Sequence, residues 1–109
     1  MLLLDESRYH PRLLEAGGIA VVLFSSPACG TCRVVEKRLP TALPEGTHLF
    51  KVDVQRATGL ARAFEIFHLP TLLLYRDGHF HARLESEISA PALRAAMARA
   101  LARPAEEEP

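Results

Sequence analysis

The sequence predicts an α/β domain in which a mixed sheet of about five strands is flanked by helices on both faces. Apolar runs rich in β-branched residues alternate with helix-like segments through most of the chain, which indicates parallel strand–helix–strand units. A turn signal at 76–79 then joins two short apolar runs, which indicates an antiparallel hairpin. The 109 residues suffice for one domain with a real core.

The first half of the chain supplies three of the expected strands. The elements are a short strand at 2–4, a helix capped by Asp5 or Ser7 and ended by Gly17-Gly18, a strand at 19–25, a helix from about Gly30, and a strand at 48–54. We expect Tyr9, Leu13 and Leu14 to share one side of the first helix. Pro40 should end or kink the second helix.

The second half supplies two helices and the hairpin. The elements are a helix at 59–67 with Leu60, Phe64 and Phe67 on one side, strands at 71–75 and 80–84, and a helix capped by Ser89 with Pro91 in its first turn. The phenylalanines at 24, 50, 64 and 67 are interpreted as core residues. We expect the domain to span residues 1–103 and the acidic segment 104–109 to be disordered.

Composition excludes several function classes. Thirteen basic and thirteen acidic residues give a formal net charge of zero, which argues against a generally basic nucleic-acid-binding protein. No apolar run approaches the roughly 20 residues of a membrane-spanning helix. The apolar start, Met1 to Leu4, is too short for a signal peptide. We therefore expect a cytoplasmic protein without nucleic-acid or membrane partners.

The two cysteines of the chain form a single motif, Cys29-Gly30-Thr31-Cys32. The motif lies between the expected strand at 19–25 and the following helix, so Cys29 should sit near a helix N-terminus. Free backbone N–H groups and the helix dipole there stabilise a thiolate, which is the reactive form of cysteine. A structural disulfide is a weaker explanation, because so short a ring would restrain the unfolded chain only slightly.

Three segments carry a resemblance to the thioredoxin family. They are Val21-Val22-Leu23-Phe24 leading into Cys29-Gly30-Thr31-Cys32, Lys51-Val52-Asp53-Val54, and Leu69-Pro70-Thr71-Leu72-Leu73-Leu74-Tyr75-Arg76-Asp77-Gly78. The match covers roughly residues 2 to 103, which makes it far more specific than a CxxC motif alone. The Cys-Gly-Thr-Cys version is similar to small bacterial thioredoxin-like proteins.

The resemblance implies a thioredoxin fold and a protein-disulfide reductase that acts through a Cys29/Cys32 dithiol. Cys29 would be the nucleophile, and Cys32 the buried resolving thiol. Pro70 would be cis beside the dithiol, and Lys51 would lie under the sheet near the site. The implied substrate-binding residues are Ala28, Gly30, Thr31, Leu69 and Pro70.

The resemblance also implies how electrons reach the site. The redox-active disulfide would need no bound cofactor or metal. A reductase or a low-molecular-weight thiol would supply electrons to a monomer, which would reduce or exchange disulfides of proteins or small thiols.

The sequence departs from the family at three positions near the motif. Ala28 stands where the family usually has tryptophan, and Thr31 where it often has proline. The family's buried aspartate, a proposed proton acceptor for the resolving cysteine, would fall at Leu23. The acceptor for the Cys32 proton is therefore left open between water, the leaving thiolate and another side chain.

Three nearby residues have two interpretations each. His68, two residues before Pro70, is either a group that moves protons or stabilises the thiolate, or an exposed loop histidine. The Thr31 hydroxyl either bonds a sulfur or is simply tolerated in the first helical turn. Lys51 is either a supporting residue of the site or a strand residue whose ammonium reaches solvent.

Other functions remain open for the motif itself. A zinc site would need ligands from the five histidines, and His79 and His81 share a face of the expected strand. Two protomers could also share an iron–sulfur cluster through their CxxC motifs. The main alternative is a redox sensor or protein-binding module with this fold and no turnover, since a fold does not fix a function.

Overall fold

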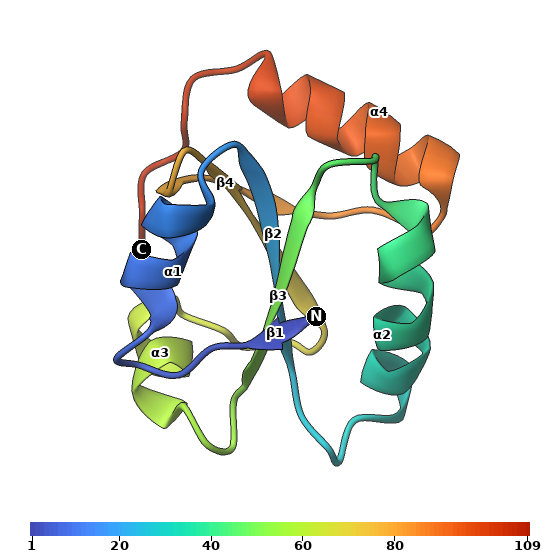
Figure 1. The fold of residues 1–109 in the computed structure, drawn as a ribbon. Helices are drawn as coiled ribbons and strands as arrows, with labels where there is room; N and C mark the ends of the chain where they lie inside the picture. The colour runs from blue at the N-terminus through green and yellow to red at the C-terminus, as the bar shows by residue number, and fades with distance from the viewer.

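The computed structural model describes residues 1–109 and contains one five-stranded sheet with two helices on each face (Figure 1). The strands are β1 (Leu2–Leu3), β2 (Ile19–Ser25), β3 (His48–Asp53), β4 (Thr71–Arg76) and β5 (His79–Leu84). The helices are α1 (Tyr9–Ala16), α2 (Gly30–Ala42), α3 (Thr58–Ala63) and α4 (Ala90–Leu101). None of these helices is long and apolar enough to cross a membrane.

The sheet is mixed, as the sequence predicts. Its strand order is β1-β3-β2-β4-β5, with β1 and β2 parallel to β3. The β2–β4 and β4–β5 pairs are antiparallel. This arrangement places β2 in the middle of the sheet. The segment that follows β2 therefore leaves the sheet at the C-terminal end of the central strand.

Side chains of β2 enter two separate cores, which explains why this strand is apolar at almost every position. Ala20, Val22 and Phe24 belong to the cluster under α1 and α3. Val21 and Leu23 belong to the cluster under α2 and α4. Alternate side chains point to opposite faces of a strand, so a strand covered on both faces needs an unbroken apolar run.

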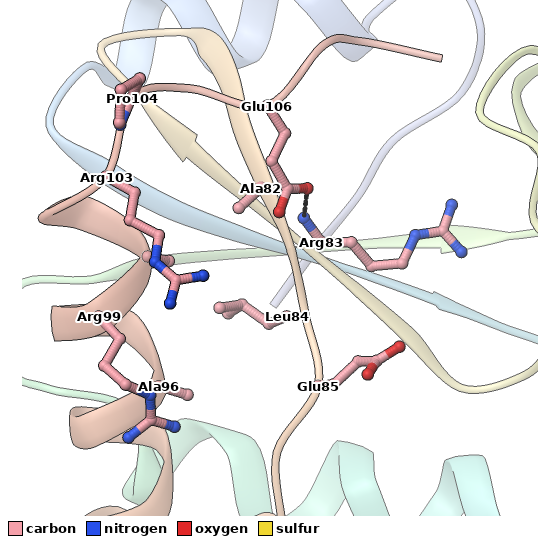
Figure 2. Close-up of a pocket in the computed structure, with 10 residues that line it drawn as sticks. Ala82, Arg83, Leu84, Glu85, Ala96, Arg99, Arg103, Pro104 and Glu106 are labelled. Carbon is pink, nitrogen blue, oxygen red and sulfur yellow. Dashed lines mark hydrogen bonds between the residues drawn. The ribbon is translucent and has the colours of Figure 1, made fainter.

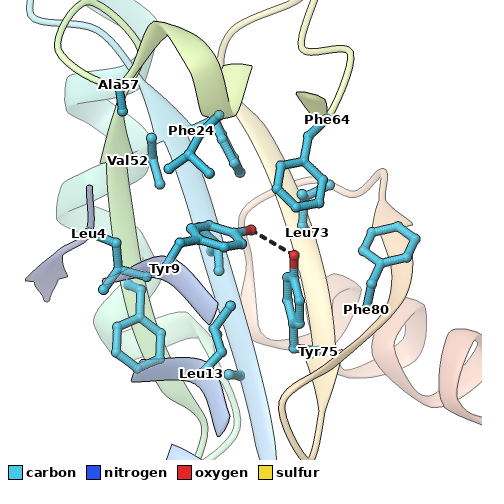
Figure 3. Close-up of a cluster of buried hydrophobic side chains, with 14 residues drawn as sticks. Leu4, Tyr9, Leu13, Phe24, Val52, Ala57, Phe64, Leu73, Tyr75 and Phe80 are labelled. Carbon is cyan, nitrogen blue, oxygen red and sulfur yellow. Dashed lines mark hydrogen bonds between the residues drawn. The ribbon is translucent and has the colours of Figure 1, made fainter. Parts of the chain in front are cut away.

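A pair of tyrosine hydroxyls lies inside the first core (Figure 3). Tyr9 of α1 and Tyr75 of β4 are 0% and 1% exposed, and their hydroxyl oxygens are 2.8 Å apart. Burial raises the pKa of both phenols above the usual value of 10.0, so both stay neutral. The hydrogen bond satisfies two polar groups that would otherwise be costly to bury, and it ties α1 to the sheet.

The β4–β5 turn docks against the end of α1. Asp77 and Gly78 have φ of +51° and +81°, as a two-residue hairpin turn requires. The Asp77 N–H donates to the Gly18 carbonyl at 2.7 Å, and the Gly18 N–H donates to Asp77 Oδ1 at 2.9 Å. The prediction that Leu14 shares one side of α1 with Tyr9 and Leu13 is wrong, because those two residues are buried whereas Leu14 is 56% exposed and instead covers Gly78.

Three other local predictions also need correction. The α1 helix begins at Tyr9 without a side-chain cap, because Asp5 Oδ1 instead accepts from the N–H groups of Ser7 and Arg8 in the preceding turn. The α2 helix does not end at Pro40 but continues to Ala42, since a proline in the last turn removes only one helical hydrogen bond. The other alternative, a kink at Pro40, stays a prediction.

The third correction concerns α3. This helix ends at Ala63, four residues before the expected end, because Phe64 has left helical geometry and Glu65 adopts a positive φ of 52°. Phe64 is buried as predicted, but Phe67 is 80% exposed and is not a core residue.

The C-terminal segment lies along β5 and forms one wall of a cavity of about 410 Å³ between β5 and α4 (Figure 2). The Glu106 N–H donates to the His81 carbonyl at 2.7 Å, and Glu106 Oε1 accepts from the Arg83 N–H at 3.0 Å. Oε1 of Glu108 lies 3.7 Å from Nε2 of His10 in α1. The two hydrogen bonds of Glu106 occupy backbone groups of β5 at the exposed edge of the sheet. The domain boundary at 103/104 stays a prediction.

Candidate functional site: the Cys29–Cys32 dithiol

Cys29 occupies the turn between β2 and α2. Its N–H donates to the Ser26 carbonyl at 3.0 Å, and the Ala28 N–H donates to Ser26 Oγ at 3.2 Å. These bonds fold the four residues between β2 and α2 into a compact turn and bring Cys29 to the N-cap of α2. The motif thus lies where the sequence predicts, at a strand-to-helix turn.

The two cysteines form a disulfide in this structure, with Cα atoms 5.3 Å apart. The Cys32 N–H donates to Cys29 Sγ at 3.2 Å. Together with the N-terminal end of the helix dipole, this donor would stabilise negative charge on Cys29 after reduction. Cys29 is partly exposed, whereas Cys32 is 1% exposed. The site therefore offers one accessible sulfur and one shielded sulfur.

The residues between the cysteines are exposed. The Thr31 hydroxyl lies 3.9 Å from Cys29 Sγ, which is a long contact in which only the hydroxyl can donate while the disulfide is formed. Gly30 is exposed, and a Cβ added to it would meet no atom within 4 Å, so its backbone is accessible beside the sulfurs. Ala28 is also exposed, and its small side chain leaves the approach to Cys29 open.

The Leu69–Pro70 peptide bond is cis, as the family resemblance implies. Both residues are partly buried, and the Thr71 hydroxyl donates to the His68 carbonyl at 2.6 Å. Pro70 lines a cavity with Val35 of α2, which places the loop against the helix that carries the dithiol. The His68 side chain is exposed and forms no hydrogen bond or ion pair, and its role stays a prediction.

A groove runs along α2 from Thr31 to Pro70. It consists of two cavities of about 410 and 300 Å³ that share Val35, Glu87 and Ile88. The other lining residues are Thr31, Val34, Arg38, Pro70, Leu72, Leu84, Glu85, Ser86 and Ser89. Apolar, polar and charged side chains all contribute to its lining, and it begins at the motif itself.

Lys51 has a partner that sequence reasoning missed. Its Nζ lies 2.9 Å from Glu36 Oε1, and both side chains are about 30% exposed. The Ser25 hydroxyl donates to the same oxygen at 3.1 Å. Glu36 follows Cys32 by four residues, and that helical spacing is the sequence signal that could have identified it.

No group of three or more histidine, cysteine, aspartate or glutamate side chains is arranged to hold a metal ion. The expected histidine pair is divided between solvent and core: His79 is exposed, whereas His81 is 5% exposed. The Nε2 atom of His81 lies 2.6 Å from the Ala100 carbonyl oxygen of α4, so its ring joins α4 to β5.

Comparison with known proteins gives consistent matches along the chain. A sequence model of the thioredoxin family matches residues 1–99. A thioredoxin of Chlamydia pneumoniae is 31% identical over 71 residues, which are 63% of this chain and 70% of the relative. A thioredoxin of Acetoanaerobium sticklandii is 27% identical over 81 residues, covering 72% of this chain and 77% of the relative.

Solved structures agree with the sequence comparisons. Fasciola hepatica thioredoxin superposes with a TM-score of 0.76 at 25% identity, covering 91% of this chain and 98% of that one. The zinc-bound form of human ERp44 also gives a TM-score of 0.76, at 19% identity. The match covers 31% of the ERp44 chain, and this likeness shows the fold alone.

Proposed function

Because this chain belongs to the thioredoxin family and is a thiol–disulfide oxidoreductase, we propose that Cys29 is its nucleophile and Cys32 its resolving thiol. The observation that carries this assignment is the difference between the two sulfurs. Cys29 is partly exposed and accepts the Cys32 N–H at 3.2 Å, whereas Cys32 is 1% exposed. An incoming disulfide can reach only the first sulfur.

The proposed reaction has two steps. The Cys29 thiolate attacks one sulfur of the target disulfide, forms a mixed disulfide and releases the first target thiolate. The Cys32 thiolate then attacks Cys29 Sγ, which breaks the bond to the target and releases the second thiolate. Two electrons move from the protein to the target, and the Cys29–Cys32 disulfide remains. No bound organic cofactor or metal is required for either step.

We assign substrate binding to the surface around the motif. An extended peptide would contact Ala28, Gly30 and Thr31 and run toward Pro70, while the backbone of Leu69 offers hydrogen bonds. The groove between α2 and the segment 85–89 extends this surface beyond the motif. Lys51 supports the site from the other side of α2.

The family implies disulfide-containing protein substrates and a reductase partner. Our proposal adds that the protein acts as a monomer and accepts electrons from a reductase or a low-molecular-weight thiol. A cytoplasmic location would suit it, because a reducing compartment keeps such a dithiol in its reduced form. Nucleic acid and membrane surfaces are not among the proposed partners.

A Cys32→Ser variant tests this assignment. Without the resolving thiol, the variant should accumulate mixed disulfides through Cys29, and its turnover of a model disulfide should fall to background. Non-reducing electrophoresis and mass spectrometry of the intact adduct, with Cys29 identified by proteolysis, provide the readout. Failure of the reduced variant to form an adduct, while the reduced parent protein still reduces the same disulfide, would refute the assigned roles.

A further inference from the structure

The second step requires the Cys32 thiol, which is almost completely buried, to lose its proton. Cys32 is 1% exposed. Leu23 pairs with Lys51 across the β2–β3 ladder, and this leucine is apolar and fully buried. The central strand therefore supplies no carboxylate on the face toward α2. The acceptor must come from another element or from solvent.

Glu36 lies on the same helix as Cys32, one turn further along the chain. The two residues are four apart on α2, so their side chains share one helix face with Cβ atoms about 5–6 Å apart. The Ser25 hydroxyl and the Lys51 ammonium both bind Oε1 of Glu36, from β2 and β3 respectively. These two bonds hold the carboxylate against the sheet.

The second oxygen of Glu36 remains available. The only hydrogen bond of the Glu36 carboxylate is made by Oε1, and every buried side-chain oxygen and nitrogen has a partner, so Oε2 is reached by solvent. Glu36 also lines a polar cavity of about 190 Å³. The charged groups around this cavity are Arg33 on α2 and Lys51 and Asp53 on β3. The cavity is large enough to admit water, which could carry a proton to the bulk.

We propose that Glu36 is the proton acceptor for Cys32, held in place by Lys51 and Ser25. In the mixed disulfide, the Cys32 proton passes to Glu36, directly or over one water molecule. The Cys32 thiolate forms its bond to Cys29 Sγ as the bond from Cys29 to the target breaks. The released target thiolate takes a proton from solvent, and Glu36 returns its own proton to water in the cavity. This inference rests on the roles proposed above for the two cysteines.

Stopped-flow reaction of the reduced protein with an aromatic disulfide that releases a coloured thiolate separates the two steps. Attack by Cys29 appears as a phase that depends on reagent concentration, and attack by Cys32 as a later phase that does not. In Glu36→Gln we expect the first rate to stay within about 2-fold, and the second to fall about 10-fold or more near pH 7. The deficit should shrink as pH rises, because hydroxide then removes the thiol proton.

A matched control removes a different charge from the same cavity. Asp53→Asn leaves Glu36 and its two partners in place, so we expect its second phase to stay within about 2-fold of the parent. Glu36→Asp retains a carboxylate and should recover part of the lost rate. Thermal unfolding confirms that each variant is folded, and Glu36→Asp serves as the test if Glu36→Gln does not fold.

Two outcomes would overturn the assignment to Glu36. One is a second phase in Glu36→Gln that matches the parent, or that is slowed equally at every pH, since the latter indicates only a structural role. The other is a larger effect of Asp53→Asn, which would make Asp53 the acceptor. If the parent protein lacks a two-phase reaction altogether, it is the proposed two-step function that fails.

Discussion

Replacing Cys29 with serine is expected to reduce disulfide turnover to the uncatalysed background. A serine hydroxyl is not ionised near neutral pH and cannot form a disulfide, so neither step can begin. The steady-state rate at which the protein, recycled by a small dithiol, reduces a model protein disulfide measures this loss. Cys32 alone should not compensate, because it is 1% exposed and a target disulfide cannot reach it.

The reduced form of the parent protein is the reference for stability, because the variant cannot form the Cys29–Cys32 disulfide. Similar thermal unfolding of the two shows that lost activity reflects lost chemistry. Turnover above about a tenth of the parent rate in folded Cys29→Ser would contradict a nucleophilic role for Cys29. The non-turnover alternative, a redox sensor or binding module, instead predicts that the parent itself is near background.

Among glycine-to-alanine substitutions in this chain, Gly78→Ala should lower the free energy of unfolding the most. Gly78 has a φ of +81°, which costs a residue with a Cβ about 1–2 kcal/mol. A Cβ at this position would also lie 2.6 Å from Leu14 Cδ2 and 2.7 Å from Leu14 Cα. The side-chain atom can move, but the backbone atom belongs to α1. We expect a loss of about 3 kcal/mol in the free energy of unfolding.

Gly46→Ala is the matched control for this effect. Gly46 has a φ of +86°, yet a Cβ there meets nothing within 4 Å. Its substitution should therefore cost only the strain of a positive φ in a residue with a Cβ, about 1–2 kcal/mol. Denaturant unfolding of both variants measures the difference. Equal losses in the free energy of unfolding would show that the contact between a Cβ at position 78 and Leu14 of α1 adds no destabilisation.

The sheet could be predicted from the sequence because its signals are local. The run from Ile19 to Ser25 is long, apolar and bounded by glycine and proline, so its ends match the observed strand. The hairpin has its own turn signal at Asp77-Gly78. The dithiol could be predicted for the same reason, since four consecutive residues carry the motif.

Predictions that depended on distant contacts were less successful. Leu14 and Phe67 have the apolar character of core residues, but whether they are buried depends on where α1 and α3 end and on what packs there. The hydrogen bonds of Glu106 to β5 join residues more than twenty positions apart. Nothing in the composition of an acidic C-terminal segment indicates such a contact.

The Glu36–Lys51 pair illustrates this limit within the site. The family resemblance drew attention to Leu23 as the position of an absent carboxylate. The carboxylate that meets Lys51 comes instead from α2, fifteen residues before its partner. Local helical spacing relates Glu36 to Cys32, but only the packing of α2 on the sheet relates it to Lys51.

A redox titration of the Cys29–Cys32 pair tests the central claim most directly. The protein would be equilibrated across a series of dithiothreitol poises, and its thiols would be trapped and counted by mass spectrometry. We predict one two-electron transition in which both thiols are lost together. Its midpoint potential should be about −270 mV, as expected for a disulfide reductase. A potential at or above about −200 mV would indicate exchange or sensing instead. Failure to form an intramolecular disulfide at any poise would contradict the account.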